Sequence, residues 1–125
     1  MTISRLLIAN RGEVAVRIAR AAADLNIATV AVYPEDDATS LHTRLADQAV
    51  ALEGRGVAAY LDGEQLLRVA REHGCDAVHP GYGFLSESPT FAALCEQAGI
   101  IFVGPSSETL SLLGDKARAR ELAQE

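Results

Sequence analysis

The feature that most constrains the fold is an alternation of short apolar runs with longer segments of helical periodicity. The first run is Leu6-Leu7-Ile8-Ala9, and apolar residues at helical spacing follow it as far as Leu25. A short, continuous apolar run is typical of a strand that is buried on both faces of a parallel sheet. Strands that alternate with helices imply right-handed crossovers. The sequence therefore predicts an α/β fold, a Rossmann-like, doubly wound parallel sheet of about five strands.

Start and stop signals define the other elements. Asp62 is expected to cap one helix, and Ser88 is expected to cap another with Pro89 at its first position, where proline is favoured. In the first helix, Ala21 and Leu25 are expected on the buried face, opposite the polar residues. The predicted strands span 6–9, 27–33, 48–52, 76–79 and 100–103, and the predicted helices span 14–25, 41–45, 63–73 and 89–97, with two more from about 107 and 115.

Composition narrows the class of protein. The chain has 125 residues, about one domain, and only 5% of them are aromatic, so Ala, Val, Leu and Ile must build the core. A net charge of −6 argues against a nucleic-acid partner, because such binders depend on clustered Lys and Arg. No apolar run approaches the roughly 18 residues of a membrane span, and the N-terminus shows no signal-peptide pattern. A protein that contacts neither nucleic acid nor membrane is expected.

The two cysteines and the last helix add two expectations. Cys75 and Cys95 lie in apolar contexts and are predicted to be buried free thiols in a reducing, cytoplasmic compartment. No His or Cys spacing fits a metal site. The last predicted helix reaches Gln124-Glu125 without glycine, proline or a cationic last turn. This ending is more typical of a fragment of a longer protein than of a natural terminus.

Ligands of an open parallel sheet bind beyond the carboxyl ends of its strands. The segment 54–59 matches the letters G-x-G-x-x-A of a dinucleotide turn, but Asp62-Gly63 interrupts the helix that should open directly after it. The first turn has only one glycine, so Asn10 and Arg11 are expected to hold neighbouring loops or another part of a larger protein. The acidic run 35–37 is interpreted as a solvated loop, because a receiver-type cation site needs carboxylates after the first and third strands.

Two other segments carry stronger signals. In His79-Pro80-Gly81-Tyr82-Gly83-Phe84-Leu85-Ser86-Glu87, two glycines let the backbone approach a ligand and Tyr82 offers an aromatic face, while Phe84 and Leu85 are expected in the core. In Gly114-Asp115-Lys116, a lysine stands near the start of a helix, where its charge opposes the helix dipole and where an anion would bind.

These two segments, together with 8–15 (I-A-N-R-G-E-V-A) and 102–105 (F-V-G-P), resemble the N-terminal domain of biotin carboxylase. The match is collinear and covers essentially all 125 residues, and the 79–87 block is highly specific to biotin-dependent carboxylases. The resemblance implies a pre-ATP-grasp domain over residues 1–125, with the ATP-grasp central and C-terminal domains outside this chain. One departure is Ser88, where the family usually has Asn; because Ser can also cap a helix, only a local change is expected.

The resemblance also implies an activity. Enzymes of this family are carbon–nitrogen ligases that carboxylate carrier-bound biotin, using ATP, Mg²⁺ or Mn²⁺, and bicarbonate. Carboxyphosphate forms and releases carbon dioxide, which the ureido nitrogen of biotin captures. Lys116 matches a lysine that contacts ATP, Tyr82 and Gly83 match the loop that faces biotin, and Arg20 and Asp24 correspond to positions near the homodimer contact. No catalytic residue and no metal ligand is expected within this segment.

The implied partners are the downstream ATP-grasp domains, the biotin carboxyl carrier protein, the carboxyltransferase that selects the acceptor, and a second copy of the enzyme. Two alternatives remain open. One is a stand-alone Rossmann-like module that binds a nucleotide or a protein. The other is the leading domain of a different ATP-grasp enzyme, and the 79–87 block argues against it.

Overall fold

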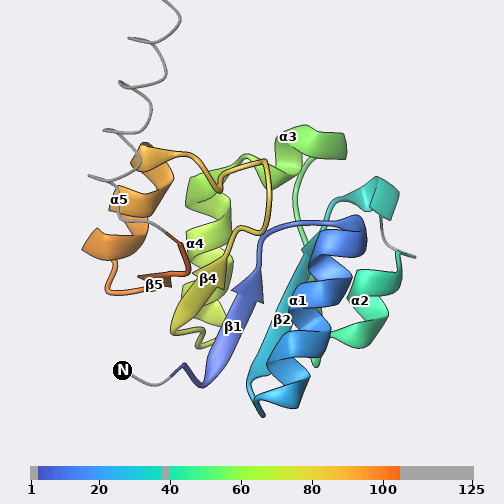
Figure 1. Ribbon diagram of the computed structural model, residues 1–125. Coiled ribbons are helices and arrows are strands. Elements are labelled where there is room, and N and C mark those ends of the chain that lie inside the picture. Colours follow the sequence, from blue (N-terminus) through green and yellow to red (C-terminus); the bar gives the residue numbers. More distant parts are fainter. Residues whose placement is uncertain (1–2, 38–39, 105–125) are drawn as a thin grey trace, which may run out of the picture.

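The computed structural model describes residues 3–37 and 40–104 and contains one five-stranded, all-parallel sheet (Figure 1). The strand order is β3-β2-β1-β4-β5, so the predicted α/β, doubly wound sheet is confirmed. The strands are β1 (Arg5–Ile8), β2 (Ala28–Tyr33), β3 (Gln48–Ala51), β4 (Ala77–His79) and β5 (Ile101–Phe102). The helices are α1 (Gly12–Asp24), the 3₁₀ turn η1 (Glu35–Asp37), α2 (Leu41–Leu45), α3 (Gly56–Tyr60), α4 (Gly63–Glu72) and α5 (Pro89–Gln97).

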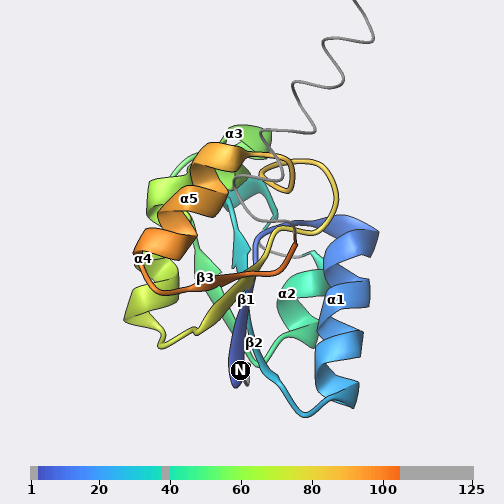
Figure 2. The same cartoon turned by 60° about the vertical axis from the view of Figure 1, so that its left-hand side comes forward.

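The helices form a layer on each face of the sheet. Figure 2 shows α1 and α2 on one side and α3, α4 and α5 on the other. Because successive side chains of a strand point to opposite faces, β1 contributes to both cores. Leu7 packs with the side chains beneath α4 and α5, whereas Leu6 and Ile8 pack beneath α1. All three are almost completely buried, which explains why this strand is apolar at consecutive positions.

The capping roles predicted for Asp62 and Ser88 are confirmed. The Asp62 side chain accepts a hydrogen bond from the Gln65 backbone N–H. The Ser88 side chain, which directly precedes Pro89, accepts one from the Phe91 backbone N–H. Ser88 therefore does the capping expected of it despite its departure from the family pattern. Cys75 and Cys95 are buried free thiols, and burial raises the pKa of each to about 11, so both remain protonated near neutral pH.

The sequence expectations for the last turn of α1 and for the segment 56–60 are wrong. Ala21 and Leu25 are exposed, Leu25 to 71%, because α1 contacts the sheet through Ala15, Ile18 and Ala22 and ends before Leu25. The five-residue helix α3 was not predicted, because a segment this short shows no helical periodicity. The expected helices after residue 104 lie outside the described residues.

Candidate functional site

The sheet has a switch point between β1 and β4. These strands are neighbours, but the chain leaves β1 toward α1 on one face and leaves β4 toward α5 on the other (Figure 2). Ligands of open α/β sheets bind in the crevice at such a point, beyond the carboxyl ends of the strands. The two segments that meet there are 9–12, which holds the turn after β1, and 80–83, which holds the glycines around Tyr82.

Asn10 joins these two segments. Its Nδ2 donates to the carbonyl oxygens of Pro80, at 2.7 Å, and Tyr82, at 2.8 Å. Its Oδ1 accepts the backbone N–H of Arg11 at 2.7 Å. The side chain is buried, so each polar atom needs a partner, and each has one. The expectation that Asn10 holds a neighbouring loop is therefore confirmed.

The loop needs glycine where it passes Asn10. Gly81 has a φ of +70°, and a Cβ at this position would lie 2.7 Å from Asn10 Nδ2 and 2.7 Å from a methyl group of Val14. A larger residue would strain the backbone and push the amide away. Of the two glycines around Tyr82, Gly81 is therefore needed both for a turn and for the close approach of two loops.

His79 gives the loop a second attachment. The backbone N–H of Gly81 donates to His79 Nδ1 at 3.0 Å, which requires this nitrogen to be unprotonated. Burial lowers the pKa of His79, so the neutral ring is favoured and its proton resides on Nε2. The strand end and the loop that follows it are therefore locked together at neutral pH.

Tyr82 projects from this fixed backbone into solvent. Its side chain is 83% exposed, although its own carbonyl oxygen is held by Asn10. The next residues anchor the loop from the other side: Leu85 is buried, and the Phe84 ring packs on Tyr60 with 5.4 Å between centroids. The expected exposure of the Tyr82 ring and the expected packing of Phe84 and Leu85 against the core are confirmed, and together they describe an aromatic side chain presented on a braced loop.

A second polar cluster lies at the same edge of the sheet, after β2. The Tyr60 hydroxyl donates to Asp37 Oδ2 at 2.9 Å, and Arg11 Nε lies 3.5 Å from the same oxygen. Burial, reinforced by the hydrogen bond to Asp37, raises the pKa of Tyr60 well above its usual range. The solvated-loop interpretation of 35–37 is therefore wrong for Asp37, whose partners are distant in sequence.

Asp36 explains the G-x-G-x-x-A segment. Its Oδ1 accepts the backbone N–H of Gly56 at 2.9 Å, at the first residue of α3, and this bond lowers the pKa of Asp36. A helix does open within the segment, contrary to expectation. The first backbone N–H of this helix already donates to the Asp36 carboxylate. The segment is therefore given no nucleotide role.

Comparison with known proteins shows what kind of domain carries this site. Residues 2–110 match the family model for the biotin carboxylase N-terminal domain. The chain belongs to this family. It is 53% identical over 121 residues to a putative urea carboxylase of Emericella nidulans, covering 97% of this chain and 10% of that protein. The chain thus spans about a tenth of that relative.

Solved structures of biotin carboxylase domains share the fold. One, from a single-chain bacterial carboxylase, is 67% identical with a TM-score of 0.90, covering 97% of this chain and 28% of that one. Another is the domain dimer of Hydrogenobacter thermophilus 2-oxoglutarate carboxylase in complex with MgADP, ADP and bicarbonate. It is 44% identical with a TM-score of 0.91, covering 99% of this chain and 27% of that one.

The biotin carboxylase resemblance selected five residues, and the structure places four of them. Tyr82 and Gly83 lie in the exposed loop at the switch point. Arg20 and Asp24 are exposed on the second half of α1, which runs back from β1 and so ends at the opposite edge of the sheet. Lys116 lies outside the described residues. The loop and the α1 pair are therefore separate surfaces.

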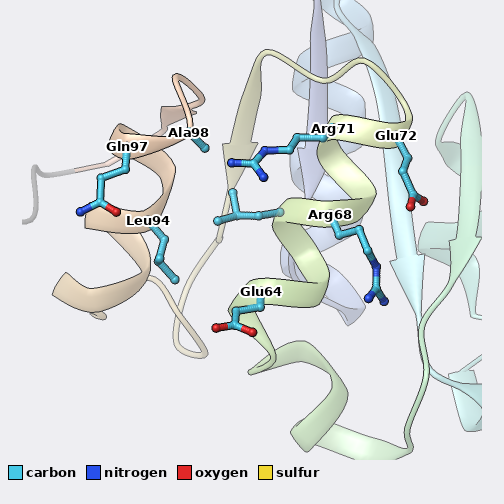
Figure 3. A pocket seen from close by; sticks show the side chains of 8 residues that line it. Glu64, Arg68, Arg71, Glu72, Leu94, Gln97 and Ala98 are labelled. Carbon is cyan, nitrogen blue, oxygen red and sulfur yellow. The ribbon is translucent and has the colours of Figure 1, made fainter.

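A surface hollow runs between α4 and α5, where Figure 3 shows Arg71 reaching toward the α5 side while Arg68 and Glu72 point away. All its lining residues belong to the two helices or their ends, so it does not join the loops that follow the strands. Within 3–37 and 40–104, no group of three or more His, Cys, Asp or Glu could hold a metal ion. No helix in these ranges is long and apolar enough to cross a membrane.

Proposed function

We propose that this chain acts as the N-terminal domain of an ATP-dependent biotin carboxylase, which carboxylates carrier-bound biotin with bicarbonate through carboxyphosphate. The observation that carries the proposal is the Tyr82 loop. It holds an exposed aromatic side chain at the switch point of the sheet, on a backbone fixed by Asn10. Membership of the family and the 67% identity to a biotin carboxylase domain support the same function.

Within this enzyme, Tyr82 and Gly83 face the ureido ring of biotin. A glycine beside the tyrosine leaves room for a ring to approach the backbone, and the phenol offers both an apolar face and a hydroxyl. Lys116 contacts ATP, whose phosphates attract a cation. Because the described residues offer no metal cluster, we assign them no step involving Mg²⁺ or Mn²⁺. The ATP-grasp domains supply those ligands and the catalytic groups.

The enzyme works with other components. It receives biotin on the carrier protein and passes the carboxyl group to a carboxyltransferase in the cytoplasm. Two of the three similar proteins named above are a putative urea carboxylase and a 2-oxoglutarate carboxylase, so the same domain serves different acceptors. The 2-oxoglutarate carboxylase structure is a domain dimer, which supports a homodimer here. The family resemblance puts Arg20 and Asp24 near the contact of that homodimer.

The first test separates this proposal from a stand-alone module. The isolated 125 residues are expected to show no bicarbonate- and biotin-dependent ATP hydrolysis, whereas the enzyme that contains them is expected to show it. Turnover by the isolated chain would refute the division of labour. A stop codon directly after Glu125 in the gene would favour a stand-alone binding module instead.

The second test concerns Tyr82 in the full-length enzyme. Tyr82→Ala is expected to raise the KM for free biotin about tenfold, because it removes one aromatic contact, and to leave the KM for ATP within about twofold of wild type. Steady-state ATP hydrolysis at varied biotin measures both. An unchanged KM and kcat for biotin would remove the loop from the site.

The third test concerns Lys116. Lys116→Ala in the full-length enzyme is expected to raise the KM for ATP, because it removes a charged contact to the phosphates of order 1.5–3 kcal/mol. The KM for biotin serves as the internal control and is expected to stay near its wild-type value. An unchanged KM for ATP would exclude Lys116 from the nucleotide site.

A further inference from the structure

We infer that Asn10 is a positioning residue for biotin: by holding two carbonyl groups of the 80–83 loop, it sets where the Tyr82 ring stands relative to the substrate. The inference rests on the proposed function, because it assumes that this loop faces biotin. Asn10 itself is buried, so it acts through the loop backbone that it holds.

The hydrogen-bond geometry leaves Asn10 little alternative. A primary amide has two N–H donors, and Nδ2 here serves two carbonyl oxygens, those of Pro80 and Tyr82. These carbonyls belong to residues on either side of Gly81, so both point at one side chain only because the backbone reverses at a φ of +70°. The remaining polar atom, Oδ1, accepts the Arg11 N–H at the start of α1. The loop is thereby tied to the end of β1.

The two halves of the loop are held by different forces. The downstream half is fixed by packing, because Leu85 is buried and the Phe84 ring packs against Tyr60 at a tilt. The upstream half carries the 83% exposed Tyr82, which adds almost nothing to the core. Its place depends on the Asn10 bonds and on the Gly81 N–H bond to His79. Loss of Asn10 therefore displaces Tyr82 while the rest of the loop stays anchored.

Asn10→Asp is the sharpest variant, because a carboxylate has nearly the same shape but lacks both donors. It would still accept the Arg11 N–H, and it would turn an anionic oxygen toward two carbonyl oxygens. Small displacements of a positioning group can cost up to about a hundredfold in rate. In the full-length enzyme we expect the KM for free biotin to rise about tenfold, with the KM for ATP within about twofold of wild type.

Gln65 offers a matched control. It is also a buried amide at the carboxyl edge: its Oε1 accepts the Glu53 N–H at 2.7 Å and its Nε2 donates to the Glu53 carbonyl at 3.2 Å. The loop it holds follows β3 and carries no proposed substrate contact. Its Nε2 also donates to Asp62 Oδ2 at 3.3 Å, so Gln65→Glu removes the same kind of donor and turns an anionic oxygen toward a carboxylate. It is expected to destabilise the fold at least as much as Asn10→Asp without changing the KM for biotin.

The test combines these variants with Tyr82→Ala. Asn10→Asp is expected to raise the KM for biotin in the wild-type background and to add little in the Tyr82→Ala background, because the two residues act through one contact. Equal effects in both backgrounds, an unchanged KM for biotin, or the same rise in Gln65→Glu would overturn the inference. If Asn10→Asp does not yield folded enzyme, Asn10→Ser, which replaces the two amide N–H donors by one hydroxyl on a shorter side chain without adding a charge, is measured against the same criteria.

The outcomes also separate this inference from the function on which it rests. If Tyr82→Ala alone leaves the kinetics with biotin unchanged, the loop does not face biotin and both proposals fail. If Tyr82→Ala raises the KM for biotin but Asn10→Asp does not, only the positioning role of Asn10 fails.

Discussion

Two sets of polar contacts at the carboxyl edge of the sheet, the first and the second junction, each hold a segment that carries a tyrosine. In the first junction, Asn10 ties the loop after β4 to the end of β1, and the loop ends in an 83% exposed Tyr82. In the second, Asp37 after β2 binds the Tyr60 hydroxyl, and this tyrosine has no exposed surface. One tyrosine faces outward and the other is enclosed. The comparison separates a junction that presents a side chain from one that secures the fold.

The largest change in the free energy of unfolding is expected when Tyr60 of the second junction is replaced. Tyr60→Ala removes a completely buried ring that packs on Phe84 and leaves a cavity, at a cost of about 3–5 kcal/mol in the free energy of unfolding. Tyr82→Ala is the matched control, since an exposed residue is expected to change stability by no more than about 0.5 kcal/mol. Urea-induced unfolding measures both. Similar losses for the two tyrosines would break the distinction between the junctions.

A smaller loss is expected when the partner of Tyr60 is removed. Asp37→Ala leaves a buried hydroxyl without its acceptor, which costs about 1–3 kcal/mol. In the double variant Asp37→Ala, Tyr60→Phe, the hydroxyl is absent, so its combined cost is expected to be less than the sum of the single changes. The same unfolding measurements test this. Strict additivity would show that the hydrogen bond does not couple the two residues.

The first junction was largely predictable from sequence and the second was not. Glycines around Tyr82 and a polar Asn10 directly after an apolar run are local signals, and both pointed to the switch point. The partners Asp37 and Tyr60 are separated by 23 positions, and periodicity carries no information about which distant side chains meet. The helix that places Tyr60, α3, was missed because a segment of five residues shows no helical periodicity.

Local signals also explain which parts of the fold were predicted well. Consecutive apolar residues marked all five strands, and capping residues such as Asp62 and Ser88 marked the starts of two helices. The buried face of α1 was predicted too wide, because helical spacing alone does not say where the sheet beneath a helix ends. Leu25 is exposed for this reason.

The smallest effect is a pH dependence of stability that arises from His79 in the first junction and that the second junction should lack. Because burial lowers the pKa of His79, the folded chain binds fewer protons at this site than the unfolded chain does. Stability therefore rises with pH: the contribution of neutral His79 is complete above the unfolded pKa of 6.5 and is lost as the pH falls through the lowered value. Protonation of Nδ1 would also break its bond to the Gly81 N–H.

His79→Asn isolates this contribution, because an amide oxygen near the position of Nδ1 can accept the Gly81 N–H without titrating in this range. The free energy of unfolding of the wild-type chain is expected to fall more steeply than that of His79→Asn between about pH 7 and pH 5. The pKa of Asp36 is also lowered, but from 3.8, so its loss of stabilisation begins at more acidic pH. Parallel pH profiles for the wild type and His79→Asn would show that the ring nitrogen does not hold the Tyr82 loop, and that Asn10 alone fixes its upstream half.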